Sequence, residues 1–372
     1  MELKTIRLTE TGNYRVQGRT TADRDPLTLL WSGSSLDLCV QCSELWVEVE
    51  GPYEVLENWM AFEVNGAVLA RQMVSPKRTW VCVFRARNAA KPTNVRIIKE
   101  VQAMSADPKH CLKIYGLRLD GELLPAAPKK HRIEFIGDSV TSAEGAIGDT
   151  KEEDWIAMFF SHVHSYPYMV SKELDAEYRI VSQSGWGTYV SWDNQKKCTI
   201  PRYYEQICGL VPGENFAPAG FHEKYDFSQW QPEVICVNLG TNDDGAFQNP
   251  AYTDPVTGEM TKMRMDDDVY NEEDRRNIRQ AMHDFLVMLR KDNPKAQILW
   301  CFGILGDRMG ATIKEAIAEY TKESGDTHVE YLAIPDTTPE TVGARWHPGY
   351  AAHKAAADVI VNRIQKIYSQ VE

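Results

Sequence analysis

The stretch His131–Gly145, HRIEFIGDSVTSAEG, decides how the second part of this sequence folds. Its largely apolar run 133–136, in which Ile133, Phe135 and Ile136 are hydrophobic, is typical of a buried strand, and the strand ends in Gly137-Asp138-Ser139. Gly, Asp and Ser each favour turns, so a plain turn is one interpretation. The other is a serine nucleophile held at the mouth of an α/β sheet, and three later segments of the chain help to decide between them.

Apolar runs that end in turn residues recur after this strand, as expected for buried parallel strands. They occupy residues 178–185, 233–243, 296–303 and 329–334. Segments with helical spacing alternate with them, at residues 166–179, 271–294, 311–323 and 349–369. This alternation predicts an α/β fold with a doubly wound, flavodoxin-like parallel sheet. The polar segment 247–268 is expected to form a long loop beside the third strand.

The chain before the link Pro125–Lys130 has a different character. Strand-like runs rich in Val, Ile, Trp, Tyr and Phe occupy residues 36–50, 61–70, 79–87, 93–101 and 112–124. Asn65-Gly66 and Asp120-Gly121 are hairpin signals. Short strands at this spacing predict a β-sandwich. We therefore expect a jelly-roll-like β-sandwich domain over residues 1–128 and an α/β/α domain over residues 129–372.

The composition is that of an ordinary globular protein with an acidic surface. Hydrophobic residues make up 43% of the 372 residues, enough to form cores, and the net charge of −12 does not favour nucleic acid or an anionic membrane as a partner. No window approaches the length of a membrane span. The N-terminal residues show no secretory pattern, and the eight cysteines are scattered, so we expect reduced cysteines and a cytoplasmic protein.

The expected strand ends carry a set of residues that acyl transfer requires. Ser139 follows the first strand, two glycines (Gly185 and Gly187) follow the second, and Asn242 follows the third. His347 precedes the last helix. A hydroxyl can attack when a neighbouring base takes its proton, and amide donors can hold the oxyanion that develops.

No metal or cofactor is expected at this edge of the sheet. His162 and His164 have no carboxylate or cysteine cluster beside them, so they are interpreted as a surface pair and not as metal ligands.

The order Ser, Gly, Asn, His resembles the four blocks of the SGNH hydrolases, a branch of the GDSL esterases, and the match covers roughly residues 131–372. A β-sandwich in front of such a domain further resembles the two-domain acetyl esterases of carbohydrate esterase family 2, which deacetylate plant cell-wall polysaccharides and oligosaccharides. The resemblance implies that Ser139 is the nucleophile and His347 the general base. It implies an oxyanion hole of the Ser139 backbone N–H, Asn242 and a glycine, and spacing after the strand favours Gly187 over Gly185.

One position departs from the pattern of the SGNH hydrolases. These proteins usually carry D-x-x-H, but here the acidic position is Ala344. The resemblance implies a Ser-His dyad in which His347 bonds a main-chain carbonyl, or water, in place of an acid. The rival hypothesis is an acid from the preceding loop, either Asp336 or Glu340.

The expected reaction is metal-independent removal of O-acetyl groups from a carbohydrate such as xylan or mannan. Trp346, Trp186 and Trp192 lie close to the blocks and are candidates for stacking on sugar rings, although packing in the core is an equally good reading of each. Two alternatives stay open: a GDSL esterase or lysophospholipase acting on lipid esters, and a catalytically weak carbohydrate-binding protein. The sequence does not indicate an oligomeric state.

Overall fold

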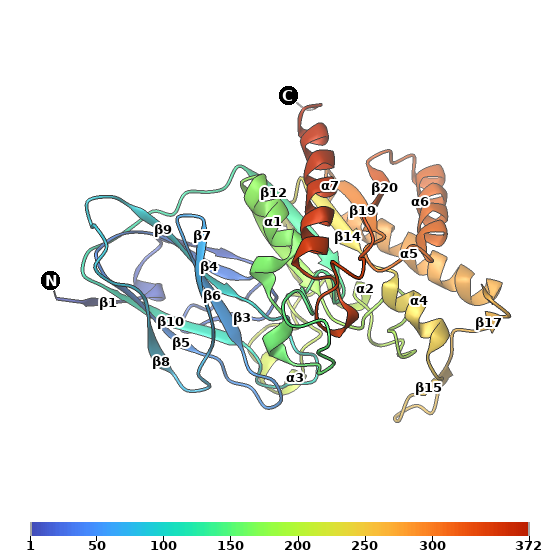
Figure 1. The fold of residues 1–372 in the computed structure, drawn as a ribbon, viewed down its shortest axis with the longest axis horizontal. Coiled ribbons are helices and arrows are strands. Elements are labelled where there is room, and N and C mark those ends of the chain that lie inside the picture. Colours follow the sequence, from blue (N-terminus) through green and yellow to red (C-terminus); the bar gives the residue numbers. More distant parts are fainter. Residues whose placement is uncertain (1, 371–372) are drawn as a thin grey trace.

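A computed structural model describes residues 2–370 of the chain, and its N-terminal part is built from two antiparallel sheets (Figure 1). The first sheet contains β1 (Lys4–Arg7), β10 (Leu112–Leu119), β5 (Leu45–Glu50), β8 (Thr79–Phe84) and β3 (Leu27–Leu29). The second contains β11 (Glu122–Leu124), β4 (Ser35–Gln41), β9 (Thr93–Lys99), β6 (Trp59–Val64), β7 (Ala67–Met73) and β2 (Tyr14–Gln17). Val47 and Leu117 of the first sheet share one core with Leu38 and Ile97 of the second, so the sheets form a sandwich.

The two predicted hairpin turns have different outcomes. Asn65-Gly66 joins β6 to its partner β7, as predicted. Asp120-Gly121 does not close a hairpin, because β10 belongs to the first sheet and β11 to the second. The Asp120 carboxylate accepts the backbone N–H groups of Ser43 (2.9 Å) and Glu44 (3.0 Å), which ties this crossing to the β4–β5 crossing beside it.

The C-terminal part contains the predicted parallel sheet. Its strands are β12 (His131–Gly137), β13 (Ala176–Ser182), β14 (Val234–Asn238), β19 (Gln297–Phe302) and β20 (Val329–Ala333). Their order in the sheet, β13-β12-β14-β19-β20, is the flavodoxin-like order 2-1-3-4-5. The topological switch point lies where β12 separates β13 from β14, and ligands of such sheets bind outside the carboxyl ends of the strands there.

Helices cover both faces of this sheet (Figure 1). The helices of this part are α1 (Tyr166–Glu173), α2 (Pro201–Tyr204), α3 (Gly213–Phe216), α4 (Thr241–Gln248), α5 (Glu272–Asp292), α6 (Gly310–Ser324) and α7 (Tyr350–Tyr368). Helices α1 and α7 share one core with the sheet, and α5 and α6 share the other. The predicted helix over 166–179 is too long: Asp175 takes a left-handed conformation (φ 47°), and β13 begins at the next residue.

The segment expected as a long loop is only partly irregular. After α4 the chain forms two short hairpins, β15 (Tyr252–Thr253) with β16 (Met260–Thr261) and β17 (Met265–Asp266) with β18 (Val269–Tyr270). Asn194 and Lys262 hold this segment, because both side chains donate to the carbonyl of Ala246 near the end of α4 (2.9 Å and 3.4 Å).

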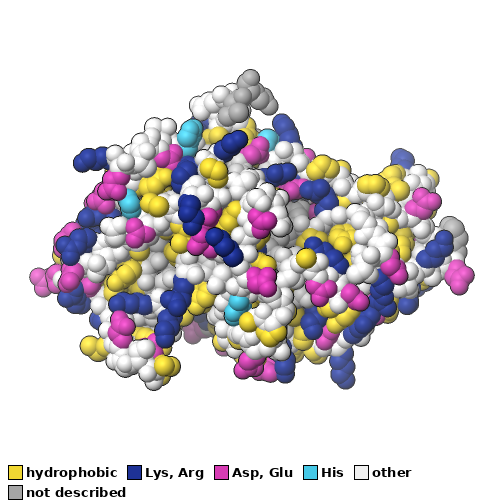
Figure 2. Space-filling model, turned by 180° about the vertical axis from the view of Figure 1, so that it is seen from behind, with side chains coloured by type: hydrophobic (Ala, Val, Ile, Leu, Met, Phe, Trp, Pro, Cys, Tyr) yellow, Lys and Arg dark blue, Asp and Glu magenta, His cyan; other side chains and the backbone are white. Residues whose placement is uncertain are grey.

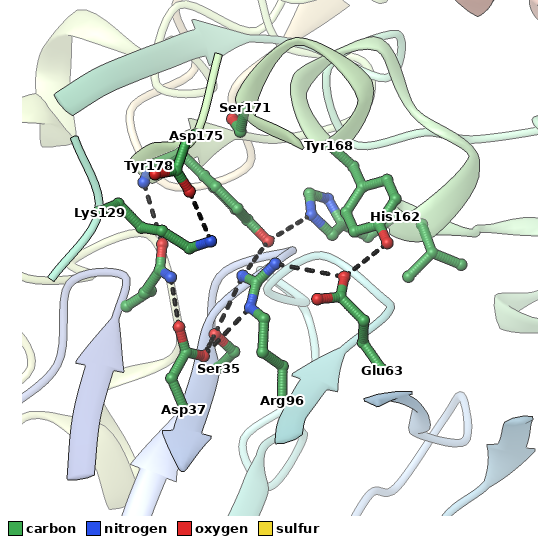
Figure 3. Close-up of polar contacts among 12 residues, drawn as sticks. Ser35, Asp37, Glu63, Arg96, Lys129, His162, Tyr168, Ser171, Asp175 and Tyr178 are labelled. Carbon is green, nitrogen blue, oxygen red and sulfur yellow. Dashed lines mark hydrogen bonds and ion pairs between the residues drawn. The ribbon is translucent and has the colours of Figure 1, made fainter. Parts of the chain in front are cut away.

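A buried polar cluster joins the sandwich to the parallel sheet (Figure 3). Arg96 of β9 pairs with Asp37 (Nε–Oδ1, 3.2 Å) and donates to the Tyr178 hydroxyl of β13 (2.9 Å). Tyr168 of α1 donates to Glu63 of β6 (2.6 Å). Charged side chains from three strands of the second sheet (β4, β6 and β9) therefore share one network with α1 and β13 of the C-terminal part.

His162 belongs to the same cluster, which corrects its expected surface position. The side chain is buried, and Nε2 lies 2.8 Å from the Tyr178 hydroxyl. Burial lowers the pKa of His162 to about 3, so the ring stays neutral. The sequence could not reveal this burial, since it depends on the packing of the sandwich against β13.

A second buried ion pair crosses the same boundary. Arg19 donates through Nη2 to Glu134 of β12 (2.8 Å), and both side chains are almost completely buried. The Tyr204 hydroxyl donates to the other oxygen of Glu134 (2.7 Å), and the Arg19 guanidinium lies over the Tyr204 ring at 4.6 Å. The strand that precedes Ser139 is thus attached directly to the N-terminal sandwich.

Acidic and basic side chains are interspersed over the face of the molecule in Figure 2. Among the described residues, no helix combines the length and the apolar character that a membrane crossing needs. All eight cysteines are free thiols, and five of them are buried.

The Arg96 cluster leads to a stability prediction. Arg96 also pairs with Glu63 (Nη1–Oε2, 3.7 Å). Arg96→Ala leaves Asp37 and Glu63, whose side chains are only 13% and 11% exposed, without their cation, and loss of one partner of a buried pair costs about 3–5 kcal/mol. Urea denaturation should show this loss in the free energy of unfolding. The control is Arg85→Ala, which breaks a largely exposed pair with Glu44 and should cost at most about 1 kcal/mol. Equal losses in the two variants would mean that the Arg96 cluster does not hold the two parts together.

Candidate active site

The turn after β12 presents Ser139 at the carboxyl edge of the sheet. Gly137 ends the strand, and a Cβ built there would lie 2.0 Å from Thr141 Oγ1 and 2.8 Å from the Asn238 carbonyl oxygen. The position therefore requires glycine, because any side chain would push the turn away from β14. The turn closes through the Ser142 backbone N–H, which donates to the Asp138 carbonyl (3.0 Å).

Asp138 fixes this turn and links it to the next strand. One carboxylate oxygen accepts the Val140 backbone N–H (3.1 Å), and the other accepts the Asn242 side-chain amide (3.0 Å). Burial raises the pKa of Asp138 to about 7, and the nearby Asp243 carboxylate acts in the same direction. These backbone and side-chain hydrogen bonds give Asp138 a structural role in the turn.

Asn242 is the second residue of α4 and lies beside the segment that follows β13. Its amide nitrogen donates to Asp138 and also to the Trp186 carbonyl oxygen (3.0 Å). The next residue, Asp243, accepts backbone N–H groups from Thr188 (2.8 Å) and Tyr189 (2.8 Å). The segments after β12, β13 and β14 are therefore joined at one point, as the sequence predicted.

The orientation of the Trp186–Gly187 peptide bears on the choice between Gly187, the predicted backbone donor, and Gly185. In a trans peptide the C=O and N–H groups point in opposite directions. Because the Trp186 carbonyl faces the Asn242 amide, the Gly187 N–H points away from it. Gly187 instead bridges to Thr199, and its carbonyl accepts the Ile200 N–H (3.1 Å). The Gly187 N–H is thus turned away from the Asn242 amide, and Gly185 is the other candidate for the backbone donor.

His347 lies in a tight loop just before α7. Its Nδ1 is 2.8 Å from the carbonyl oxygen of Arg345. A carbonyl only accepts hydrogen bonds, so Nδ1 carries the proton and the neutral ring keeps its lone pair on Nε2. The predicted contact with a main-chain carbonyl is confirmed.

The two rival acids make other contacts. Asp336 accepts the backbone N–H groups of Gly306 (3.0 Å) and Thr337 (2.8 Å). Glu340 accepts the Thr338 hydroxyl (2.7 Å), and this hydrogen bond lowers the pKa of the Glu340 carboxyl. Asp336 therefore ties its loop to the loop that follows β19, and Glu340 stabilises its own loop. Neither carboxylate is bonded to His347.

The loop that follows Ser139 packs against the loop that carries His347. The Ala344 backbone N–H donates to the Gly145 carbonyl (3.0 Å), and a Cβ at Gly145 would lie 2.7 Å from His347 Cβ. A carboxylate that sequence reasoning missed also lies here: Glu144 Oε1 is 3.7 Å from His347 Nε2. Only its position five residues after Ser139, among small residues, could have drawn attention to it.

The three tryptophans differ in exposure. Trp186 is 7% exposed and packs on Tyr203, so its side chain belongs to the core, which corrects its assignment as a sugar-stacking residue. Trp192 is 49% exposed and lies against Gly185. Trp346 is 73% exposed and lines a surface groove of about 700 Å³. Lys151, Leu305, Asp336 and Pro339 also line this groove.

Residues 2–370 contain no group of three or more His, Cys, Asp or Glu side chains placed to hold a metal ion. The chemistry available at this edge of the sheet is that of a hydroxyl, an imidazole and amide donors. This set suits acyl transfer through a serine.

Known proteins share this fold and, in one case, much of the sequence. An acetyl xylan esterase from the rumen bacterium Butyrivibrio proteoclasticus is 40% identical, with a TM-score of 0.97 over 100% of both chains. A family two carbohydrate esterase from Clostridium thermocellum, solved with cellohexaose, is 23% identical, with a TM-score of 0.78 over 96% of this chain and 99% of that one, and shows a shared fold.

A curated relative is longer than this chain. The cellulase/esterase CelE of Acetivibrio thermocellus is 25% identical over 343 residues, which are 90% of this chain but only 37% of that protein. No family model matches the sequence.

The contact between the two loops can be tested at Gly145. Gly145→Ala places a Cβ 2.2 Å from the Ala344 carbonyl oxygen and 2.7 Å from His347 Cβ, so the His347 loop must move. Because small displacements of reacting groups are costly, kcat for ester hydrolysis should fall by roughly tenfold or more. Gly258→Ala is the control, since Gly258 also has positive φ (72°) but no atom within 4 Å of its Cβ position. Similar activity in the two variants would contradict this prediction.

Proposed function

Since this chain belongs to carbohydrate esterase family 2, we propose that it is a serine esterase that removes O-acetyl groups from carbohydrate. The observation that carries the mechanism is the hydrogen bond from His347 Nδ1 to the Arg345 carbonyl (2.8 Å). It sets the tautomer in which Nε2 can accept a proton, beside the loop that follows Ser139.

In the proposed reaction, Ser139 Oγ attacks the acetyl carbonyl carbon while His347 Nε2 takes the hydroxyl proton. The sugar oxygen leaves with that proton, and an acetyl-enzyme forms on Ser139. A water molecule then attacks this ester, again with His347 as base, and releases acetate and free Ser139. The Arg345 carbonyl carries no full charge, so it orients the imidazole without the ionic stabilisation that an aspartate supplies.

The oxyanion of each tetrahedral intermediate needs hydrogen-bond donors. We assign this role to the backbone N–H groups of Ser139 and Gly185 and to the side-chain amide of Asn242. Asp138 holds one side of that amide (3.0 Å). The same Asn242 amide also donates to the Trp186 carbonyl oxygen. We assign this second N–H as the donor that bonds the oxyanion when the tetrahedral intermediate forms.

The proposed substrate is an acetylated plant polysaccharide or oligosaccharide such as xylan or mannan. Support comes from the 40% identity to an acetyl xylan esterase. The exposed rings of Trp346 and Trp192 offer faces on which sugar rings can stack, and Trp346 immediately precedes the proposed base. Polar side chains at the groove beside Trp346, among them Lys151 and Asp336, can form hydrogen bonds with sugar hydroxyl groups.

We also propose that the chain divides into a jelly-roll-like domain over residues 1–128 and an SGNH hydrolase domain over residues 129–372. The change from antiparallel to parallel sheets between β11 and β12 supports this division.

The nucleophile is tested by Ser139→Ala, which should lower kcat on p-nitrophenyl acetate by on the order of 10⁴ or more. Ser142→Ala, in the same turn, is the control and should stay within roughly tenfold of the parent, because that hydroxyl only bonds Ser182. A serine-directed organophosphate should label the protein once, at Ser139. Labelling at another residue would overturn the assignment.

The substrate class is tested with a panel of esters. Rates should fall from p-nitrophenyl acetate to the butyrate and octanoate, and acetylated xylooligosaccharide should release acetate. Rising activity with chain length would instead identify a lipid esterase. Binding to oligosaccharide without hydrolysis would identify a binding protein.

The dyad is tested by Asp336→Asn and Glu340→Gln. Loss of the acid in a Ser-His-Asp triad costs on the order of 10⁴ in kcat. Because the hydrogen bonds of both carboxylates go to Gly306, Thr337 and Thr338 and not to His347, each amide variant should keep kcat within about tenfold of the parent. A collapse of activity in either one would show that an acid orients His347 after all.

A further inference from the structure

Two consecutive residues before His347 adopt a conformation that side chains disfavour. Arg345 has φ of 54° and Trp346 has φ of 60°, both in the left-handed region. Non-glycine residues are uncommon there, and the surrounding structure must hold them in place. The Arg345 carbonyl that accepts the His347 Nδ1 proton belongs to this turn. Whatever holds Arg345 therefore holds the orientation of the imidazole.

Arg345 is anchored to the segment that follows Ser139 by both its backbone and its side chain. Its backbone N–H donates to the Glu152 carbonyl (2.8 Å). Its guanidinium donates through Nε to Glu144 Oε1 (3.0 Å) and through Nη1 to the Glu153 carbonyl (3.0 Å). Glu144 is only 2% exposed, so its carboxylate is shielded from solvent, and removing its partner Arg345, whose side chain is 30% exposed, leaves a buried charge unpaired.

Glu144 also faces the reactive side of the imidazole. Its Oε1 lies 3.7 Å from His347 Nε2, the nitrogen that accepts the Ser139 proton in the proposed mechanism. Once Nε2 is protonated, this carboxylate attracts the imidazolium, and low solvent exposure strengthens the attraction. An aspartate of a triad supplies the same stabilisation from the Nδ1 side.

Few other charges act on His347. Arg345 contributes a guanidinium, which is already paired with Glu144. His353 on α7 is buried, and burial together with the proximity of His347 lowers its pKa to about 3, so it stays neutral. Among the described residues, Glu144 is the acidic residue whose carboxylate lies within 4 Å of the His347 ring nitrogens.

We propose that Glu144 and Arg345 form a positioning pair that replaces the missing triad aspartate. The guanidinium, tied to Glu144, holds the strained turn so that its carbonyl bonds Nδ1, and the Glu144 carboxylate stabilises the imidazolium from the Nε2 side. The inference rests on the proposed function, since it assumes that His347 is the base. Neither residue is assigned a contact with substrate.

The pair is tested with Glu144→Gln, Arg345→Ala, Arg345→Lys and the Glu144→Gln/Arg345→Ala double variant of the full chain. The control is Asp326→Asn, which breaks another Arg–carboxylate pair (Arg290 Nε to Oδ2, 2.7 Å) just before β20, at the opposite edge of the sheet. The substrate is p-nitrophenyl acetate, and kcat, KM, the pH dependence of kcat/KM and thermal unfolding are measured for each protein.

We expect Glu144→Gln and Arg345→Ala each to lower kcat by roughly tenfold or more with little change in KM, because they disturb the base and not substrate binding. Loss of the Glu144 charge destabilises the imidazolium, so the acidic limb of the kcat/KM profile should move to lower pH. Arg345→Lys should recover part of the loss. The double variant should be no worse than the poorer single one, because the two residues act as a unit.

Activity within twofold of the parent in both single variants, with an unchanged pH profile, would overturn the inference. So would a loss of kcat that only follows a loss of thermal stability and leaves the acidic limb in place, since that pattern belongs to a purely structural ion pair. Failure of the proposed function is distinguishable: in that case the parent itself does not hydrolyse the ester, or Ser139→Ala keeps its activity.

Discussion

The site depends on β12 lying between β13 and β14 in a parallel sheet. Parallel pairing brings the carboxyl ends of the three strands to one edge, so the residues after them meet although they are distant in the sequence. The hydrogen bond between Asp138 and Asn242 (3.0 Å) spans this edge. It also compensates part of the cost of burying the Asp138 carboxyl, whose raised pKa reflects that cost.

The N-terminal sandwich supports the same edge. Gln102, just after β9, accepts both the backbone N–H of Ser184 (2.8 Å) and its hydroxyl (3.1 Å), one residue before Gly185. Glu100 accepts the Ser161 hydroxyl (2.8 Å) in the segment that leads to α1. Together with the contacts of Arg96 and Arg19, these hydrogen bonds make the sandwich part of the frame that positions the segment around Gly185.

Most of the fold could be predicted from the sequence, and each prediction that is wrong has a local cause. Apolar runs flanked by turn residues located all five parallel strands, because buried strands must be apolar on both faces. The helix over 166–179 was too long because Asp175 and the start of β13 continue a pattern that helical spacing alone accepts. The hairpin expected at Asp120-Gly121 is wrong, because a turn signal does not show to which sheet the next strand belongs. His162 was placed at the surface because its burial is created by the sandwich.

The sequence by itself determined the chemistry of the candidate site: the order of Ser139, Asn242 and His347 and the absence of an acid at Ala344, since the identity of each residue limits what it can do. Only the tertiary structure decided what surrounds them. The Arg345 carbonyl reaches His347 through a strained turn, and Glu144 meets Arg345 across 201 residues of sequence. The preference for Gly185 over Gly187 follows from the direction of one peptide plane. The type of a single residue does not reveal the direction of a peptide plane or a contact between distant residues. Both arise only when separate segments of the chain pack against each other.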